Sequence, residues 1–268
     1  MIMLWVVLAS GTLLPARTDV DRAWSMLTDG AADQKADKRV KAIQALGLLQ
    51  GNVKAQRMAE KVLQTDEKPE VRAAAATALG QMGAKSSAAR LKAALNDADP
   101  EVVLAAANSL YLLRDPIAYE VYYAVLMGER KSGDGLLESQ LNNLKDPKFV
   151  AKMAVGFVPF GGIGYEVYKA FAKDDTSSVR AAAAHRLIRD PDLKSADALA
   201  QASSDSKWLV RAAAVDALAR RGDPAFLQTA ILLLDDENDT VRYNAAAAVV
   251  RLSRRVPASS MNLKSEQR

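Results

Sequence analysis

Apolar positions recur along the chain at the spacing of one face of a helix, and the block that carries them is repeated. Residues 71–79 (VRAAAATAL) return in related form at 102–110, 179–187, 210–218 and 241–249, and an earlier copy lies at 38–46. The offsets between the last five copies are 31, 77, 31 and 31 residues. Larger apolar residues share each block with alanine, which lets a neighbouring backbone come close. The pattern predicts six copies of one helix rather than a sheet.

Charged residues mark the start of each copy. An aspartate lies five residues before the first position of every block, and an arginine follows that position in all copies except the third, which has Val103. An Asp and an Arg six residues apart on either side of a turn can form a charge-assisted hydrogen bond. We therefore predict a structural ladder rather than a binding site. Its members are Asp33, Arg39, Asp66, Arg72, Asp97, Asp174, Arg180, Asp205, Arg211, Asp236 and Arg242.

The turn aspartate, the Val-Arg pair and the Ala-x-Ala-Leu helix together resemble the HEAT family, in particular its short alanine-rich type, the PBS-lyase HEAT-like repeats. The resemblance covers roughly residues 20–254 apart from one interruption. It implies an all-α fold, a right-handed α-solenoid of about six helix pairs. In such a repeat a first helix leads to the aspartate turn, and a second helix lines a concave face used for binding. The resemblance by itself implies no catalytic activity.

Two positions of the second helix are expected to face outward in every repeat. The sixth residue after the first block position is, in order, Gln44, Thr77, Asn108, His185, Asp216 and Ala247. The second residue after the first block position is, in the same order, Val40, Ala73, Leu104, Ala181, Ala212 and Tyr243. Neither row contains lysine or arginine, so no groove that follows a phosphate backbone is expected. Small polar and apolar side chains suit a polypeptide, and Asn108 and His185 are candidate contacts.

An insertion of 46 residues at 128–173 separates the third and fourth copies, because the 77-residue offset equals 31 plus 46. The segment 117–124 (IAYEVYYA) is echoed at 163–170 (IGYEVYKA) at the same offset of 46, so we interpret both as first helices of a repeat. Ten of the 15 aromatic residues lie between Tyr111 and Phe171, around an uncharged, glycine-rich run at 155–164. Most of the distinctive chemistry of the chain is therefore concentrated here.

Three interpretations of this aromatic segment stay open. It is a helical hairpin that fills a gap in the stack, an exposed loop that binds a polypeptide or an apolar ligand, or a loop that makes weak contact with a membrane surface. The uncharged run at 153–165 is too short to span a membrane. The glycines at 161–164 do not form a dinucleotide fingerprint, since no strand precedes them. The candidate contact residues are Tyr111, Tyr122, Tyr123, Phe157, Phe160 and Tyr165.

Composition excludes several classes of site. The chain has no cysteine and one histidine, which excludes disulfides, Cys-ligated zinc, iron–sulfur clusters and any site with two imidazoles. We predict no metal and no cofactor. The net charge of +4 arises at 251–268, where five basic residues accompany one acidic residue, so residues 1–250 are neutral overall. A nucleic-acid partner is therefore not expected.

The first 16 residues (MIMLWVVLASGTLLPA) carry no charge. They resemble the apolar part of a secretory signal, although no Lys or Arg precedes them, and the alternative is an apolar first helix that caps the core. The first interpretation predicts a periplasmic or secreted protein, the second a cytoplasmic one. The predicted organisation is this segment at 1–16, repeats at 17–127, the insertion at 128–173, repeats at 174–254 and a basic tail at 255–268.

The pattern favours a non-catalytic scaffold that binds a protein or peptide partner through the concave face and the aromatic insertion. One alternative is an enzyme or enzyme accessory related to bilin lyases, with Glu120 or Glu166 beside Tyr122 or Tyr168. A second alternative is a nucleic-acid-binding solenoid, which the neutral body disfavours. No residue is assigned a catalytic role, and the oligomeric state is not predicted.

Overall fold

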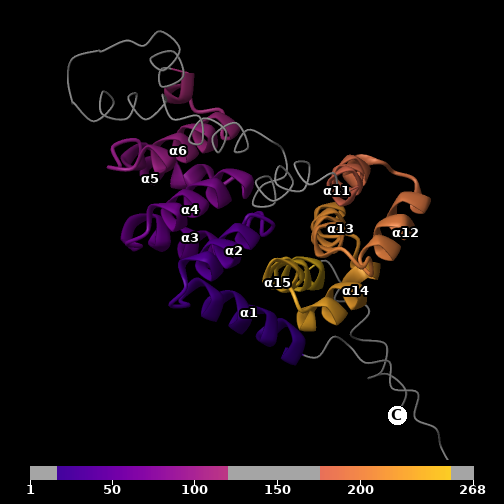
Figure 1. The fold of residues 1–268 in the computed structure, drawn as a ribbon. Helices are drawn as coiled ribbons and strands as arrows, with labels where there is room; N and C mark the ends of the chain where they lie inside the picture. The colour runs from indigo at the N-terminus through magenta and orange to yellow at the C-terminus, as the bar shows by residue number, and fades with distance from the viewer. Residues whose placement is uncertain (1–16, 120–175, 255–268) are drawn as a thin grey trace, which may run out of the picture.

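The computed structural model describes residues 17–119 and 176–254, and every regular element within these ranges is a helix (Figure 1). The first range contains α1 (Arg17–Ala31), α2 (Ala36–Leu46), α3 (Val53–Thr65), α4 (Pro69–Gln81), the 3-10 turn η1 (Lys85–Ser87), α5 (Ala88–Ala94) and α6 (Pro100–Leu112). The second contains α11 (Ser177–Arg186), η4 (Leu187–Arg189), α12 (Leu193–Ala202), α13 (Trp208–Arg221), η5 (Pro224–Phe226), α14 (Leu227–Leu232), η6 (Leu233–Asp235) and α15 (Asp239–Ser253). The predicted α-solenoid is confirmed.

The repeated blocks form α2, α4, α6, α11, α13 and α15, which are the second helices of their repeats. Pro69 and Pro100 open α4 and α6 in the first turn, where a missing N–H leaves no hydrogen bond unmade. At the other end, Gly222 closes α13 at a φ of 75°, a left-handed conformation that glycine adopts without steric cost. The bounds of the insertion, at 128 and 173, lie outside the described residues.

Alanine lets the second helices pack closely. The alanines that face the neighbouring helices of α4, α13 and α15 are almost fully buried, with Leu79, Leu218 and Leu252 between them. At the contact between α4 and α6 the backbones themselves come close, because a Cβ built on Gly80 would stand 2.8 Å from the Cα of Ser109. The hydroxyl of Ser109 donates to the carbonyl of Ala76 at 2.8 Å across the same contact. Small side chains thus set the spacing of the stack.

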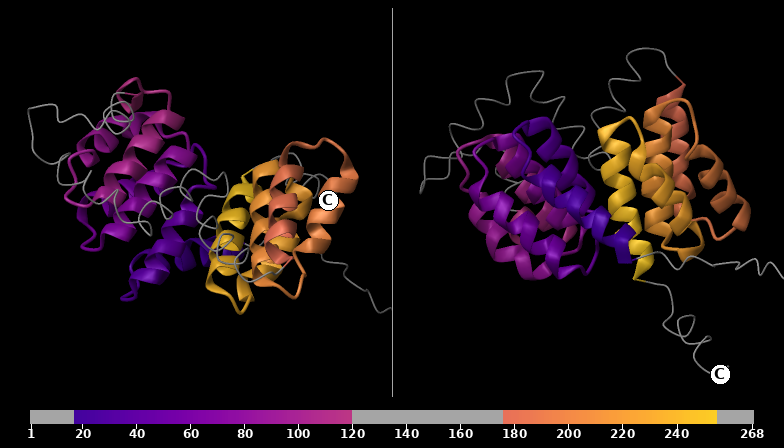
Figure 2. Two further views of the ribbon diagram at one scale, coloured as in Figure 1. Left: turned by 45° about the horizontal axis from the view of Figure 1, so that its top comes forward. Right: turned by 90° about the horizontal axis from the view of Figure 1, so that it is seen from below.

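The repeats are not stacked in the order of the sequence. The row of second helices runs α11, α13, α15, α2, α4, α6, because α15 packs against α1 and α2 (Figures 1 and 2). The last repeat therefore lies beside the first, and the third and fourth repeats, which are consecutive in sequence, occupy the two ends of the row. We call the contact of α15 with α1 and α2 the seam. Sequence periodicity did not predict this arrangement.

Apolar packing and a few polar contacts hold the seam. Leu27 of α1, Leu46 of α2 and Leu252 of α15 are fully buried in one core. A Cβ built on Gly30 of α1 would stand 2.5 Å from Cε1 of Tyr243, so the tyrosine ring occupies the space that the glycine leaves. The seam is thus a packed part of the core and not a surface contact.

Two arginines add polar contacts at the seam. The guanidinium of Arg22, on α1, forms an ion pair with Asp235, which lies next to the turn before α15. Arg251, on α15, donates to the carbonyl oxygen of Leu48, just after α2. The pair between Arg22 and Asp235 is largely exposed and contributes little stability, so the apolar contacts dominate.

Candidate interaction face

Each described turn aspartate folds the loop between its two helices. One carboxylate oxygen, Oδ1, accepts the backbone N–H of the residue two positions on, at 2.8 Å for Asp33 and Asp205 and at 2.9 Å for Asp66, Asp97 and Asp236. This Asx turn replaces a backbone hydrogen bond and redirects the chain into the second helix. The recurrence of aspartate at this position therefore has a local structural cause.

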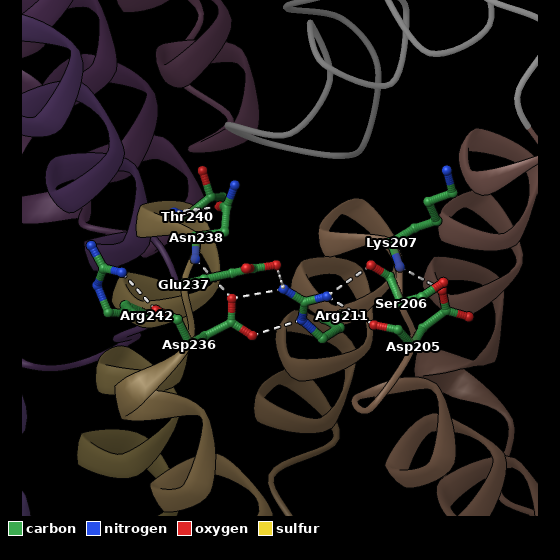
Figure 3. Close-up of polar contacts among 9 residues, drawn as sticks. All are labelled: Asp205, Ser206, Lys207, Arg211, Asp236, Glu237, Asn238, Thr240 and Arg242. Atoms are coloured by element: carbon green, nitrogen blue, oxygen red, sulfur yellow. Dashed lines mark hydrogen bonds and ion pairs between the residues drawn. The ribbon is translucent and has the colours of Figure 1, made fainter.

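The arginines pair with the next repeat rather than with their own. Arg211 donates from Nε to Oδ2 of Asp236 at 2.6 Å and from Nη2 to Oδ1 at 2.9 Å (Figure 3). Arg211 also donates from Nη1 to the backbone carbonyl of Asp205, in the turn of its own repeat, at 2.8 Å. The expected bond between an Asp and the Arg six residues later is present, but at the backbone carbonyl of the Asp and not at its carboxylate. The guanidinium pairs instead with the carboxylate of the neighbouring turn, because the arginine side chain spans the gap between the two turns. The ladder joins repeats.

The same arrangement recurs along the row. Arg39 pairs with Asp66, Arg72 with Asp97 and Arg180 with Asp205. The pairs at Arg39 and Arg211 have both side chains at least nine-tenths buried, whereas the side chain of Arg180 is 43% exposed. The remaining predicted member, Asp174, lies outside the described residues.

The ladder changes at the seam. Arg242, which belongs to the last repeat, bonds Asp239 and the carbonyl of Asp236 in its own turn. The first turn aspartate, Asp33, lies 3.5 Å from the ammonium group of Lys38. Among the described contacts at the seam, no arginine of the last repeat pairs with the turn aspartate of the first repeat, as happens at the other junctions. The ring of Tyr243 packs against Gly30 there instead.

Burial and hydrogen bonding shift the pKa values of the ladder carboxylates in opposite directions. Burial on its own raises the pKa of Asp236, but the bonds from the Arg211 guanidinium and the Asn238 N–H outweigh it, so the pKa lies below its ordinary value. Asp66 and Asp97 show the same balance and the same direction of pKa shift. These groups stay ionised at neutral pH and serve the architecture.

The two rows predicted to face outward behave differently. In the sixth-position row, Gln44, Thr77, Asn108, His185 and Asp216 are half-buried and reach the surface, and only Ala247 is buried. In the second-position row, Ala73, Ala181, Ala212 and Tyr243 are buried, so the prediction that this row faces outward is wrong for these four. The close approach of adjacent second helices turns these positions into packing contacts. The sixth-position row is the surface of this face.

The second-helix face also carries a positive charge outside the two rows, at Arg220. Asp216, in the sixth-position row, accepts from Nε of Arg220 at 2.8 Å, one helical turn further along α13. Burial lowers the pKa of Arg220, but the carboxylate of Asp216 outweighs this and leaves the pKa above its ordinary value. The arginine is therefore neutralised locally, which agrees with the absence of a phosphate-binding track.

The candidate contact residues are divided between the two ends of the row. Asn108 and Tyr111 lie on α6, and His185 lies on α11, with α13, α15, α2 and α4 between these helices. The ring of Tyr111 meets that of Tyr119 edge to face, with 5.8 Å between centroids and 75° between planes. The structure does not bring Asn108 and His185 into one contiguous cluster. Tyr122, Tyr123, Phe157, Phe160 and Tyr165 lie outside the described residues.

The described ranges contain neither a cluster of metal-ligating side chains nor a helix able to span a membrane. Among residues 17–119 and 176–254, no group of three or more His, Asp or Glu side chains could hold a metal ion. No helix in the part of the chain that the structure describes combines the length and the apolar character needed to cross a membrane.

Comparisons with known proteins bear on the repeats. The family model for HEAT repeats matches residues 25–111 and 166–250. No curated protein matches the sequence. A solved structure of human deoxyhypusine hydroxylase in complex with glycerol is 20% identical, with 87% of this chain and 84% of that chain covered and a TM-score of 0.33. A score at this level does not establish a shared arrangement of helices.

Proposed function

Because the chain belongs to the HEAT-repeat family, we propose that this helical repeat protein is a non-catalytic scaffold whose second-helix face binds a polypeptide partner. Stacked repeats present an extended surface on which each unit offers an equivalent position. Here the sixth-position row supplies small and mostly uncharged polar groups at those positions. Such groups can pair with the backbone of a peptide segment without imposing a strong charge preference.

The observation that carries the proposal is the exposed aromatic pair at the end of this row. Tyr111 is 47% exposed and Tyr119 is 61% exposed, and Leu112 beside them is 51% exposed. Tyrosine supplies a large apolar area and a polar tip at low cost in side-chain entropy, which is why it is enriched at protein interfaces. An apolar anchor next to a polar row fits a partner that places one side chain at α6 and runs along the second helices.

A photo-crosslinking experiment tests this proposal. A benzoylphenylalanine introduced at Tyr111 of the full chain, in the native host, should capture one defined protein. The same group at Leu232, which is 71% exposed on the first helix α14, is the matched control. We expect capture at position 111 and none of that protein at 232. Equal capture at both positions, or none at 111, would show that the second-helix face is not the binding surface.

A second arm separates the aromatic insertion from the described face. The double variant Phe157→Ala/Phe160→Ala should reduce crosslinking at position 111 if the insertion contributes to the same site. Crosslinking that stays unchanged would restrict the site to the second helices. We also propose an extracytoplasmic location, which N-terminal sequencing of the mature protein tests, since removal of the first 16 residues is the expected result.

The two alternative functions gain no support from the described residues. The glutamates and tyrosines of the enzyme alternative, Glu120, Tyr122, Glu166 and Tyr168, lie outside them. The nucleic-acid alternative requires unpaired Lys or Arg side chains along the second-helix face, and Arg220 on α13 is paired with Asp216.

A further inference from the structure

Positive charge is concentrated on the outer side of two neighbouring first helices. Together, η1, α3 and α5 carry six basic residues and a single acidic residue, Glu60. The basic residues are Lys54, Arg57, Lys61, Lys85, Arg90 and Lys92, and all six are exposed. The other described first helices do not share this bias, since α12 has one lysine and one aspartate, α14 has no charged residue, and α1 has two arginines and three aspartates.

The only acidic residue of these helices does not offset the outer charge. Glu60 is 8% exposed and is held from inside the layer. It accepts from the hydroxyl of Ser87 at 2.6 Å and from the side-chain amide of Gln56 at 2.9 Å, and Arg90 lies 3.5 Å away. The carboxylate is therefore committed to the contact between α3 and α5, and the outer face keeps its positive charge.

Four of the six cations form no ion pair with a carboxylate among the described residues, although Arg57 is close enough to Glu60 to lower the pKa of that carboxyl. Lys92 pairs with Asp115 at 2.9 Å, and Arg90 approaches Glu60. The remaining four form what we call the basic patch: Lys54, Arg57, Lys61 and Lys85. In this patch Arg57 and Lys61 lie four residues apart on one face of α3. A cluster of unneutralised positive charges on an outer helix face attracts anionic partners.

Two apolar side chains adjoin the basic patch. The ammonium group of Lys54 lies 4.1 Å from the ring centroid of Trp24, on α1. Val53, at the first position of α3, is 58% exposed. An outer helix face that combines lysine and arginine with tryptophan and an aliphatic residue is typical of a surface that lies against a lipid headgroup layer.

We propose that the basic patch binds an anionic lipid surface. A nucleic-acid strand is a weaker match, because such strands are bound in grooves with aromatic rings on which bases stack. The ring nearest to the basic patch, Trp24, is instead covered by Lys54. Attraction to anionic headgroups requires only that the charges face one plane, which two neighbouring outer helices provide. This site lies on the first helices and is separate from the proposed peptide-binding face.

Vesicle co-sedimentation with the purified full chain tests the proposal. Vesicles of phosphatidylglycerol and phosphatidylcholine should bind more protein than vesicles of phosphatidylcholine alone. Each basic residue near an anionic surface strengthens binding by about fivefold, so Arg57→Glu/Lys61→Glu should weaken binding by at least about 25-fold. Raising the salt concentration to about 0.5 M should produce a similar loss, because it screens exposed charges.

A matched variant controls for net charge. Arg189 and Lys194 are exposed in the second described range, and Arg189→Glu/Lys194→Glu changes the net charge by the same amount. This variant should keep most of the wild-type binding. Far-UV circular dichroism checks that both variants are folded, and Arg57→Gln/Lys61→Gln provides a milder change with an expected loss of about 25-fold.

Three results would overturn the proposal. Equal weakening in the two Glu variants would show that net charge, and not the basic patch, determines binding. Equal binding to neutral and anionic vesicles would show that apolar insertion alone is responsible. Binding to a single-stranded oligonucleotide that depends on Arg57 and Lys61, without binding to anionic vesicles, would assign the basic patch to nucleic acid.

Discussion

Replacing Arg211 by methionine should destabilise the protein by about 3–5 kcal/mol. Methionine fills a similar volume but removes the charge and every donor. Asp236 would then lose both guanidinium bonds while its side chain is only 6% exposed. Removal of one partner from a buried ion pair leaves the other charge uncompensated, and this costs about 3–5 kcal/mol. The backbone carbonyl oxygens of Asp205 and Ser206 also lose their donor.

The ladder itself offers a matched control. Arg180 occupies the equivalent position one repeat earlier, pairs with the equivalent aspartate, and is 43% exposed. Water can replace the lost partner there, so Arg180→Met should cost about 0–1 kcal/mol. Both variants make the same substitution, but the pair at Arg180 is more exposed and its one described bond runs from Nη1 to Oδ2 of Asp205.

Urea denaturation of the three proteins, followed by far-UV circular dichroism, measures these differences through the midpoint at constant m. The double variant Arg211→Met/Asp236→Asn should recover at least half of the loss, because asparagine removes the stranded charge and keeps the acceptor for the N–H of Asn238. If Arg211→Met costs no more than Arg180→Met, burial does not determine the strength of the ladder and the reasoning is refuted.

Three further predictions concern packing and pH. Gly30→Ala should destabilise the seam by about 1–3 kcal/mol, since its Cβ would stand 2.5 Å from the ring of Tyr243; combining it with Tyr243→Leu should cost less than the sum of the two single changes in thermal unfolding. Gly80→Ala should cost more than Gly30→Ala, because its Cβ would meet the backbone of Ser109 at 2.8 Å, which cannot move without α6; equal midpoints would contradict this. Folding lowers the pKa of Asp66, so the carboxylate contributes its full share of the free energy of unfolding well above about pH 4. That share is lost as the pH falls through the pKa of the folded state. A urea midpoint that does not fall between about pH 5 and pH 3 would argue against the ladder.

The sequence was sufficient to predict the repeats. The period, the turn aspartate and the alanine content are local properties, and each second helix begins two residues before its block. The structural role of the Asp and Arg residues was also predictable from their recurrence. Their partners were not, because both ends of each interaction repeat with the same period. From the sequence alone, the guanidinium of Arg39 could pair with the carboxylate of Asp33 or of Asp66, and only the spacing between the turns decides for Asp66.

The seam and the basic patch lay beyond sequence reasoning for a different reason. Tyr243 occupies the same repeat position as Ala212, and only the approach of Gly30 from α1 makes it a packing residue at a junction. Similarly, the charge count over residues 1–250 is neutral. That balance conceals a separation in space, with cations such as Arg57 on the outer face of α3 and carboxylates such as Asp66 in the turns.

The seam also constrains how this protein can be made. An ordinary array of repeats can form from its first unit onward during synthesis, since each new unit docks on the one before it. Here α1 and α2 bury apolar surface against α15, which is synthesised more than 190 residues later. At about 5–20 residues per second, that surface waits roughly 10–40 s for its partner. The nascent chain therefore has a period of vulnerability to aggregation, which ends only when the last repeat leaves the ribosome.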